Sequence, residues 1–148
     1  MKTFFPLFID IRGKKVLVIG GGKIAEGRIK ILTDFGAEIT VISPKVTEYI
    51  ENTDIHLIKR KYKKGDISSF APFLVIAATD ERQANHRAMT EAKKLNINIS
   101  VADCKEECSC YFPAIADSDA YIAGLVSKNG NHAGVKKKIK KIRRILNR

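Results

Sequence analysis

The residues best suited to chemistry stand in a glycine-rich segment, GGGKIA, at positions 20–25, directly after an apolar run. Its pattern is G-x-G-x-x-A. Gly20 permits a tight turn, Gly22 lets the backbone approach a phosphate, and the small Ala25 lets a helix pack closely on a strand. A helix that begins near Lys23 directs free N–H groups and the positive end of its dipole at such a phosphate. This pattern predicts a loop that binds the pyrophosphate of a dinucleotide.

The elements that must position this loop alternate between strand and helix. We expect strands at 15–19, 39–42, 55–59, 73–78 and 98–102, helices at 24–35, 47–51 and 79–95, and a loop with one helical turn at 62–69. Strands that alternate with helices are typical of parallel βαβ units. The sequence therefore predicts an α/β fold of the Rossmann type, with helices on both faces of a parallel sheet.

The rhythm changes after Asp103. Two short strands are expected at 111–115 and 120–127, joined by a turn at 117–119, and a basic helix follows, with His132 at its start. This order predicts a small antiparallel α+β appendage rather than another βαβ unit. We place the boundary near Pro113, which gives a dinucleotide-binding domain of residues 1–113 and a dimerisation appendage of residues 114–148.

Charge is concentrated at the C-terminus. The chain carries a net charge of +11, with 27 basic and 16 acidic residues. The last fourteen residues, VKKKIKKIRRILNR, hold eight basic residues and no acidic one, so they contribute +8 and the other 134 residues +3. Apolar residues recur at steps of three or four, which predicts a basic amphipathic helix. We expect its apolar stripe to pack on the body or on a second subunit, and nucleic acid or an anionic membrane surface are alternative partners.

The cysteines and the N-terminus bear on location. Cys104, Cys108 and Cys110 are odd in number and form no metal-ligand spacing, so we expect free thiols and no metal site. Neither a signal peptide nor an apolar run of roughly 20 residues is evident. We therefore expect a soluble cytoplasmic protein. Of the histidines, His86 is expected at the surface and His56 in a structural role.

The residues after the second predicted strand leave the type of dinucleotide open. An Asp or Glu usually stands there and binds the adenosine ribose of NAD. This chain has Ser43-Pro44-Lys45 instead. A missing acid and a nearby lysine would tolerate the 2′-phosphate of NADP, whereas Ser43 and backbone groups would suffice for the ribose of NAD.

Several segments together resemble one family. FPLFIDIRGKKVLVIGGGKIAEG, LVIAATDERQANHR and SVADCKEECSCYFPAI are similar to segments of the precorrin-2 dehydrogenase and sirohydrochlorin ferrochelatase family, the N-terminal module of siroheme synthases. The first matches an opening in which a Pro-Leu-Phe strand and an Arg-Gly turn precede the glycine loop. The likeness covers residues 4 to about 130. The chain resembles a short form, because the helical domain that usually follows in the family would begin beyond its last residue.

The resemblance implies NAD-dependent oxidation of precorrin-2 to sirohydrochlorin, in siroheme or cobalamin biosynthesis. It implies a homodimer, with metal insertion either by this chain or by a separate chelatase. Asp103 matches the aspartate to which the family's dehydrogenation is assigned. The expected cofactor-binding residues, from the motif and the resemblance together, are Gly20, Gly22, Lys23, Ile24, Ser43, Pro44 and Thr79.

Asp103 also makes chemical sense from its position. We expect it at the C-terminal edge of a strand beside the glycine loop, where open parallel sheets bind ligands. A carboxylate there can take a proton from a substrate while hydride leaves to a nicotinamide. The alternative is that Asp103 only caps a turn. A second function also remains open: an NAD(H)-sensing protein whose basic tail binds nucleic acid or a partner. For the enzyme that the resemblance implies, we expect no membrane partner and no nucleic acid.

Overall fold

The computed structural model describes residues 4–147. The chain divides into two compact units between Cys110 and Tyr111, a few residues before the boundary expected at Pro113. We call residues 1–110 the nucleotide unit and residues 111–148 the appendage.

The nucleotide unit is built on one parallel sheet of five strands. These are β1 (Lys15–Ile19), β2 (Glu38–Ile42), β3 (His56–Ile58), β4 (Leu74–Ala77) and β5 (Asn98–Val101). Their spatial order is β3-β2-β1-β4-β5, and every pairing is parallel. The chain runs from β1 outward to β3 and then crosses back to β4. The order therefore reverses between β1 and β4, which is the topological switch point where such sheets bind nucleotides.

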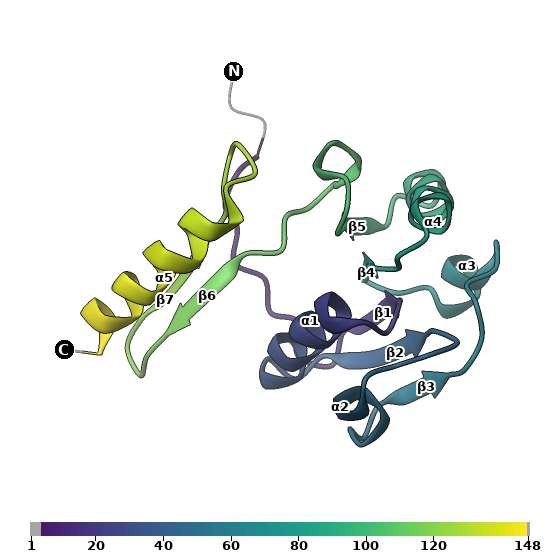
Figure 1. Ribbon diagram of the computed structural model, residues 1–148, viewed down its shortest axis with the longest axis horizontal. Helices are drawn as coiled ribbons and strands as arrows, with labels where there is room; N and C mark the ends of the chain where they lie inside the picture. The colour runs from purple at the N-terminus through teal and green to yellow at the C-terminus, as the bar shows by residue number, and fades with distance from the viewer. Residues whose placement is uncertain (1–3, 148) are drawn as a thin grey trace. The chain divides into compact units, whose positions relative to one another are not determined.

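Helices cover the sheet. They are α1 (Lys23–Asp34), α2 (Glu48–Glu51), α3 (Asp66–Phe70) and α4 (Arg82–Lys94), and a 3₁₀ helix, η1, spans Lys105–Glu107. Helices α1 and α2 contact each other on the β1–β2 half, and α3 and α4 contact each other on the β4–β5 half. Because parallel crossovers are right-handed and the strand order reverses, the two pairs cover opposite faces. Figure 1 shows α1 and α4 on either side of the strands.

The core of this unit follows from the strand sequences. In β1 the four residues Val16 to Ile19 are each at most 1% exposed, so both faces of the strand are covered. Such a strand needs an unbroken apolar run instead of an alternating one. This burial fixes the carboxyl end of β1, and with it the start of the glycine loop.

The appendage is smaller and more open. Strands β6 (Ala114–Asp117) and β7 (Ile122–Leu125) form an antiparallel hairpin, and α5 (His132–Leu146) packs on it. The Asn131 side chain caps α5 by accepting a hydrogen bond from Gly134 N at 2.8 Å. Ile139 is the buried residue of the α5 stripe, whereas Ile145 is 66% exposed. The predicted basic amphipathic helix is thus present, with His132 at its start.

Some further predictions from the sequence differ from the structure. The segment before the Arg-Gly turn forms no strand in residues 4–10, because no neighbouring strand pairs with its backbone. Helix α4 begins at Arg82 instead of Thr79, because Thr79 takes part in a loop described below. The first appendage strand starts at Ala114 instead of Tyr111. No helix in residues 4–147 has both the length and the apolar character needed to cross a membrane.

Candidate active site

A pocket of about 650 Å³ lies at the carboxyl ends of β1, β2 and β4. Its position is the switch point of the sheet, and its size is in the range of small-molecule sites. Seven predicted cofactor-binding residues line it: Gly20, Gly22, Lys23, Ile24, Ser43, Pro44 and Thr79. The tertiary structure thus brings together residues from three separate strand ends.

Two glycines of the loop are required by close packing. Gly20 has φ +116°, and a Cβ at this position would overlap the carbonyl oxygen of Ala78 at the end of β4. A Cβ on Gly21 would overlap the carbonyl oxygen of Lys45 and lie 2.6 Å from Val46 Cγ1. Gly21 stands at a free position of the G-x-G-x-x-A pattern, so sequence reasoning did not select it. Its role comes from the chain segment after β2, which only the fold brings near.

Gly22 differs from these two because a Cβ at this position would meet no atom within 4 Å. It is also the N-cap of α1, and no side chain in residues 4–147 caps this helix end by a hydrogen bond. The first backbone N–H groups of α1 therefore face the pocket side without a capping side chain, as an anion site requires. Ile24, in the first turn, is 58% exposed and lines the pocket, so it offers an apolar contact to a ligand.

A buried carboxylate steadies the same helix turn. Glu26 is 7% exposed and forms ion pairs with Lys30 at 2.7 Å and Lys23 at 3.2 Å. The hydrogen bond from Lys30 is the largest cause that lowers the pKa of Glu26 from 4.5 to about 2. The carboxylate is therefore ionised at neutral pH and also interacts favourably with the helix dipole.

The segment after β2 lies where the adenosine ribose binds in such folds. Ser43 is 6% exposed, and its hydroxyl donates a 2.6 Å hydrogen bond to the carbonyl oxygen of Lys45. This bond closes the Ser43-Pro44-Lys45 turn, and Thr47 N donates a 3.0 Å hydrogen bond to the carbonyl oxygen of Gly21 in the glycine loop. The acidic side chains that line the pocket, Asp80 and Glu81, follow β4 instead of β2.

Asn85 fixes the loop between β4 and α4. It is fully buried, and its Oδ1 accepts hydrogen bonds from the Thr79 backbone N–H (3.1 Å) and hydroxyl (2.8 Å), while its Nδ2 donates to the Thr79 carbonyl (3.0 Å). The side chain thereby ties down the whole Thr79 residue. In the sequence Asn85 is one polar residue of a predicted helix, and no local pattern indicates this positioning role, so sequence reasoning missed it.

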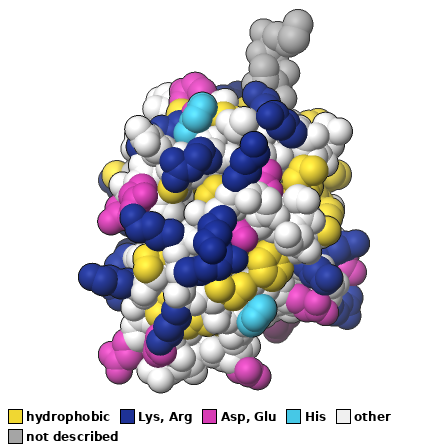
Figure 2. Space-filling model, turned by 90° about the vertical axis from the view of Figure 1, so that its right-hand side faces the viewer, with side chains coloured by type: hydrophobic (Ala, Val, Ile, Leu, Met, Phe, Trp, Pro, Cys, Tyr) yellow, Lys and Arg dark blue, Asp and Glu magenta, His cyan; other side chains and the backbone are white. Residues whose placement is uncertain are grey.

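The loop after β3 closes another side of the pocket. Arg60 forms two hydrogen bonds of 2.8 Å with the carboxylate of Asp66, and this pairing shapes the turn that carries Lys61 and Tyr62. Lys61 pairs with Glu81 across the pocket lining. Charges of both signs thus occur around the site, and Figure 2 shows basic and acidic side chains interspersed on one face of the molecule.

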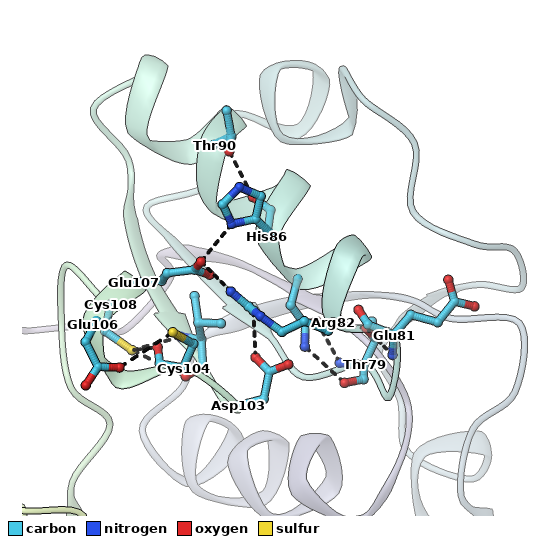
Figure 3. Close-up of polar contacts among 12 residues, drawn as sticks. Thr79, Glu81, Arg82, His86, Thr90, Asp103, Cys104, Glu106, Glu107 and Cys108 are labelled. Atoms are coloured by element: carbon cyan, nitrogen blue, oxygen red, sulfur yellow. Dashed lines mark hydrogen bonds and ion pairs between the residues drawn. The ribbon is translucent and has the colours of Figure 1, made fainter.

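Asp103 lies outside the lining of this pocket. It follows β5, and β4 separates β5 from β1, so Asp103 is one strand further from the glycine loop than expected. Its Oδ1 lies 3.1 Å from Arg82 Nη1, and 35% of its side chain is exposed. Because Arg82 directly follows Glu81 of the pocket lining, this ion pair joins Asp103 to the pocket loop (Figure 3). Asp103 thus lies at the carboxyl edge of the sheet, as predicted. Its strand, β5, is not adjacent to β1, which carries the glycine loop.

The three cysteines stand in the loop after Asp103 and are free thiols. Burial raises the pKa of Cys110 to about 11 and also raises that of Cys108. Cys108 Sγ accepts a hydrogen bond from Val101 N at 3.1 Å, which anchors the loop to β5. In the part of the chain that the structure describes, no three side chains of His, Cys, Asp or Glu gather as metal ligands.

The residues present fit a dinucleotide. A glycine turn opens a helix at the switch point, open space faces Gly22, and an exposed apolar side chain, Ile24, lines the pocket. The fold and the site together define a dinucleotide-binding protein of the Rossmann type. A family model described as "Putative NAD(P)-binding" matches residues 7–114. The chain belongs to this family.

Two curated relatives and one solved structure extend the comparison. The chain is 50% identical over 146 residues to the "Probable multifunctional siroheme biosynthesis protein HemA" of Ruminiclostridium josui, covering 95% of this chain and 28% of that protein. It is 34% identical over 128 residues to the siroheme synthase of Pseudomonas fluorescens (strain SBW25), covering 84% and 27%. The chain thus spans less than a third of these relatives. The structure of SirC, a precorrin-2 dehydrogenase, matches its fold with a TM-score of 0.74 at 22% identity, covering 94% of this chain and 69% of that one.

Proposed function

We propose that this chain catalyses the NAD-dependent oxidation of precorrin-2 to sirohydrochlorin in siroheme biosynthesis. The single observation that carries the proposal is the pocket at the switch point, where the seven predicted cofactor-binding residues meet. The similarity to two siroheme biosynthesis proteins supports the choice of substrate. A place in cobalamin biosynthesis would require the same reaction, because precorrin-2 oxidation is the shared step.

The glycine loop and the N-terminus of α1 would hold the pyrophosphate of NAD, and Ser43 with Pro44 would hold its adenosine ribose. Bound NAD supplies the hydride acceptor. Asp103 accepts the proton that precorrin-2 releases as it is oxidised, acting as a general base. Asn85 keeps Thr79 in place, so the loop that follows β4 has a fixed conformation at the pocket.

We further propose that the protein acts in the cytoplasm as a homodimer. Free thiols agree with a reducing compartment. The appendage supplies the dimer contact in this proposal, because it has little buried core of its own. A separate chelatase acts on the product when this chain does not insert the metal.

The test is an anaerobic assay of purified protein with precorrin-2 and NAD, followed by the absorbance of NADH and sirohydrochlorin. We expect turnover by the wild type and a decrease of about 10²- to 10⁴-fold in Asp103→Ala, with an unchanged Kd for NAD by calorimetry. Asp103→Asn retains an acceptor for Arg82 but cannot serve as the base, so it should be equally impaired. Asp119→Ala, an exposed acid in the appendage, is the matched control.

Two results would contradict the proposal in different ways. Unchanged turnover in Asp103→Ala removes Asp103 from the mechanism but leaves the activity. An inactive wild type that binds NAD(H) and shows tight, salt-sensitive binding to DNA supports the alternative, a nucleotide-sensing protein with a basic tail. A parallel reaction with sirohydrochlorin and Fe²⁺ as substrates measures whether this chain inserts the metal.

A further inference from the structure

Asp103 is one end of a row of four charged or titratable side chains. Arg82 Nη1 lies 3.1 Å from Asp103 Oδ1, and Arg82 Nη2 pairs with Oε1 of Glu107. The same Glu107 oxygen lies 2.7 Å from His86 Nδ1. Figure 3 shows Arg82 between the two carboxylates, with His86 beyond Glu107. Glu107 therefore holds one terminal nitrogen of the Arg82 guanidinium, Nη2, while the other, Nη1, faces Asp103.

Exposure identifies the anchor of this row. The Glu107 side chain is 16% exposed, whereas those of Arg82 and Asp103 are 44% and 35% exposed. The hydrogen bond from Arg82 lowers the pKa of Glu107, and the hydrogen bond with Glu107 raises the pKa of Arg82. Both groups are thus charged across the physiological range. Glu107 restrains the guanidinium, and the guanidinium presents a fixed positive charge to Asp103.

The three residues come from three different segments. Arg82 is the first residue of α4 and follows the pocket-lining Glu81, Asp103 follows β5, and Glu107 ends η1. The ion pairs therefore connect the loop that carries Asp103 to the loop that lines the cofactor pocket. Hydrogen bonds of Cys108 with Val101 hold the far end of the same loop. Asp103 therefore lies within the loop that the Val101–Cys108 contacts close.

We propose that Arg82 is a positioning residue that holds the Asp103 carboxylate in a fixed orientation toward the substrate. The inference rests on the proposed function, because it assigns the partner of its general base. Arg82 donates to Oδ1, so the second oxygen, Oδ2, is the one that accepts the proton. An arginine can fill this role without competing as a base, because it does not deprotonate in proteins.

The test compares Arg82→Ala, Arg82→Lys and the wild type in the precorrin-2 assay. Arg82→Ala should lower kcat by about 10- to 100-fold through misplacement of the base, with KM for precorrin-2 and Kd for NAD within about two-fold of wild type. Arg82→Lys should recover part of kcat, and guanidinium ion at a non-denaturing concentration should partly rescue Arg82→Ala. Lys94→Ala, an exposed basic residue of the same helix, is the control.

Other outcomes overturn the inference. A kcat within two-fold of wild type in Arg82→Ala shows that Asp103 needs no such partner. A rise in KM for precorrin-2 with unchanged kcat shows that Arg82 binds the substrate instead. If Arg82→Ala does not fold, Glu107→Gln tests the same row, and an unchanged kcat there also refutes it. An inactive wild type refutes the proposed function itself, so the two failures are distinguishable.

Discussion

The nucleotide unit buries nearly all the side chains of its central strands, whereas in residues 111–147 the buried hydrophobic residues are Ala116 and Ile139. The two units also differ in net charge. Residues 1–110 hold 18 basic and 14 acidic residues, a net charge of +4, and residues 111–148 hold 9 and 2, a net charge of +7. One unit has a core and mixed charge, and the other has a hairpin, one helix and mostly positive charge.

Because their buried cores differ, the two units can contribute to function in different ways. A fully buried parallel sheet holds loops at its carboxyl edge rigidly enough to place phosphate-binding glycines and a carboxylate. A two-stranded hairpin under one helix has too little buried surface for independent stability. We therefore expect the appendage to depend on a second surface, while the nucleotide unit is stable by itself.

The largest difference in stability between the two units should appear when one glycine in each unit is replaced by alanine. In Gly20→Ala the Cβ overlaps Ala78 O at φ +116°, so we expect destabilisation by about 3 kcal/mol or more. Gly130 has φ +77° with open space around it, so Gly130→Ala should cost only about 1 kcal/mol. Thermal unfolding measures both. Equal losses would show that packing around Gly20 is no tighter than around Gly130.

A related variant separates binding from folding in the glycine loop. The Cβ of Gly22→Ala meets no atom within 4 Å in the structure, so the melting temperature should remain near that of the wild type. The Kd for NAD should nevertheless rise about tenfold or more, because a side chain keeps the pyrophosphate from the backbone. Calorimetric titration with NAD measures this loss, and an unchanged Kd would place the pyrophosphate elsewhere.

The next effect concerns the appendage core. Ile139→Asp places a charge at a site that is 6% exposed, and we expect about 2 to 5 kcal/mol of local destabilisation, faster amide exchange in 111–147 and loss of the dimer. Ile145→Asp, at a 66% exposed site of the same helix, is the control. Amide hydrogen exchange and light scattering are the measurements. A simultaneous loss of protection in β1 and β4 would contradict independent stability of the nucleotide unit.

The smallest effect is a pH dependence of the nucleotide unit. The pKa of Glu26 is lowered to about 2, mainly by the hydrogen bond from Lys30, so its ionised form stabilises the fold. This contribution is complete above a pH of about 4.5 and is lost as the pH falls toward 2. In Glu26→Gln and in Lys30→Met, the free energy of unfolding should therefore fall less steeply as the pH is lowered. Urea unfolding at a series of acidic pH values measures it. Lys93→Met, on α4, should leave this pH dependence unchanged.

Much of the nucleotide unit could be predicted from local sequence. The run Val16 to Ile19 indicates a strand buried on both faces, and the GGGKIA segment indicates the turn and helix that follow. These signals are local because strand burial and backbone freedom depend on consecutive residues. The parallel sheet, its flanking helices and the basic terminal helix were predicted correctly for the same reason.

The remainder depended on contacts between distant segments. Gly21 is constrained by Lys45, and Thr79 by Asn85, through neighbours that the sheet order supplies. The N-terminal apolar segment has the composition of a strand but forms none in residues 4–10, because strand formation also needs a partner. The assignment of Asp103 to catalysis stays a prediction.

By itself the sequence determined the fold class and the phosphate-binding loop, because hydrophobic periodicity and glycine positions encode them locally. Only the tertiary structure decided which loops share the pocket and that Asp103 lies beyond β4, paired with Arg82. The physical reason is that strand order is set by the packing of whole βαβ units, and no short segment contains that information.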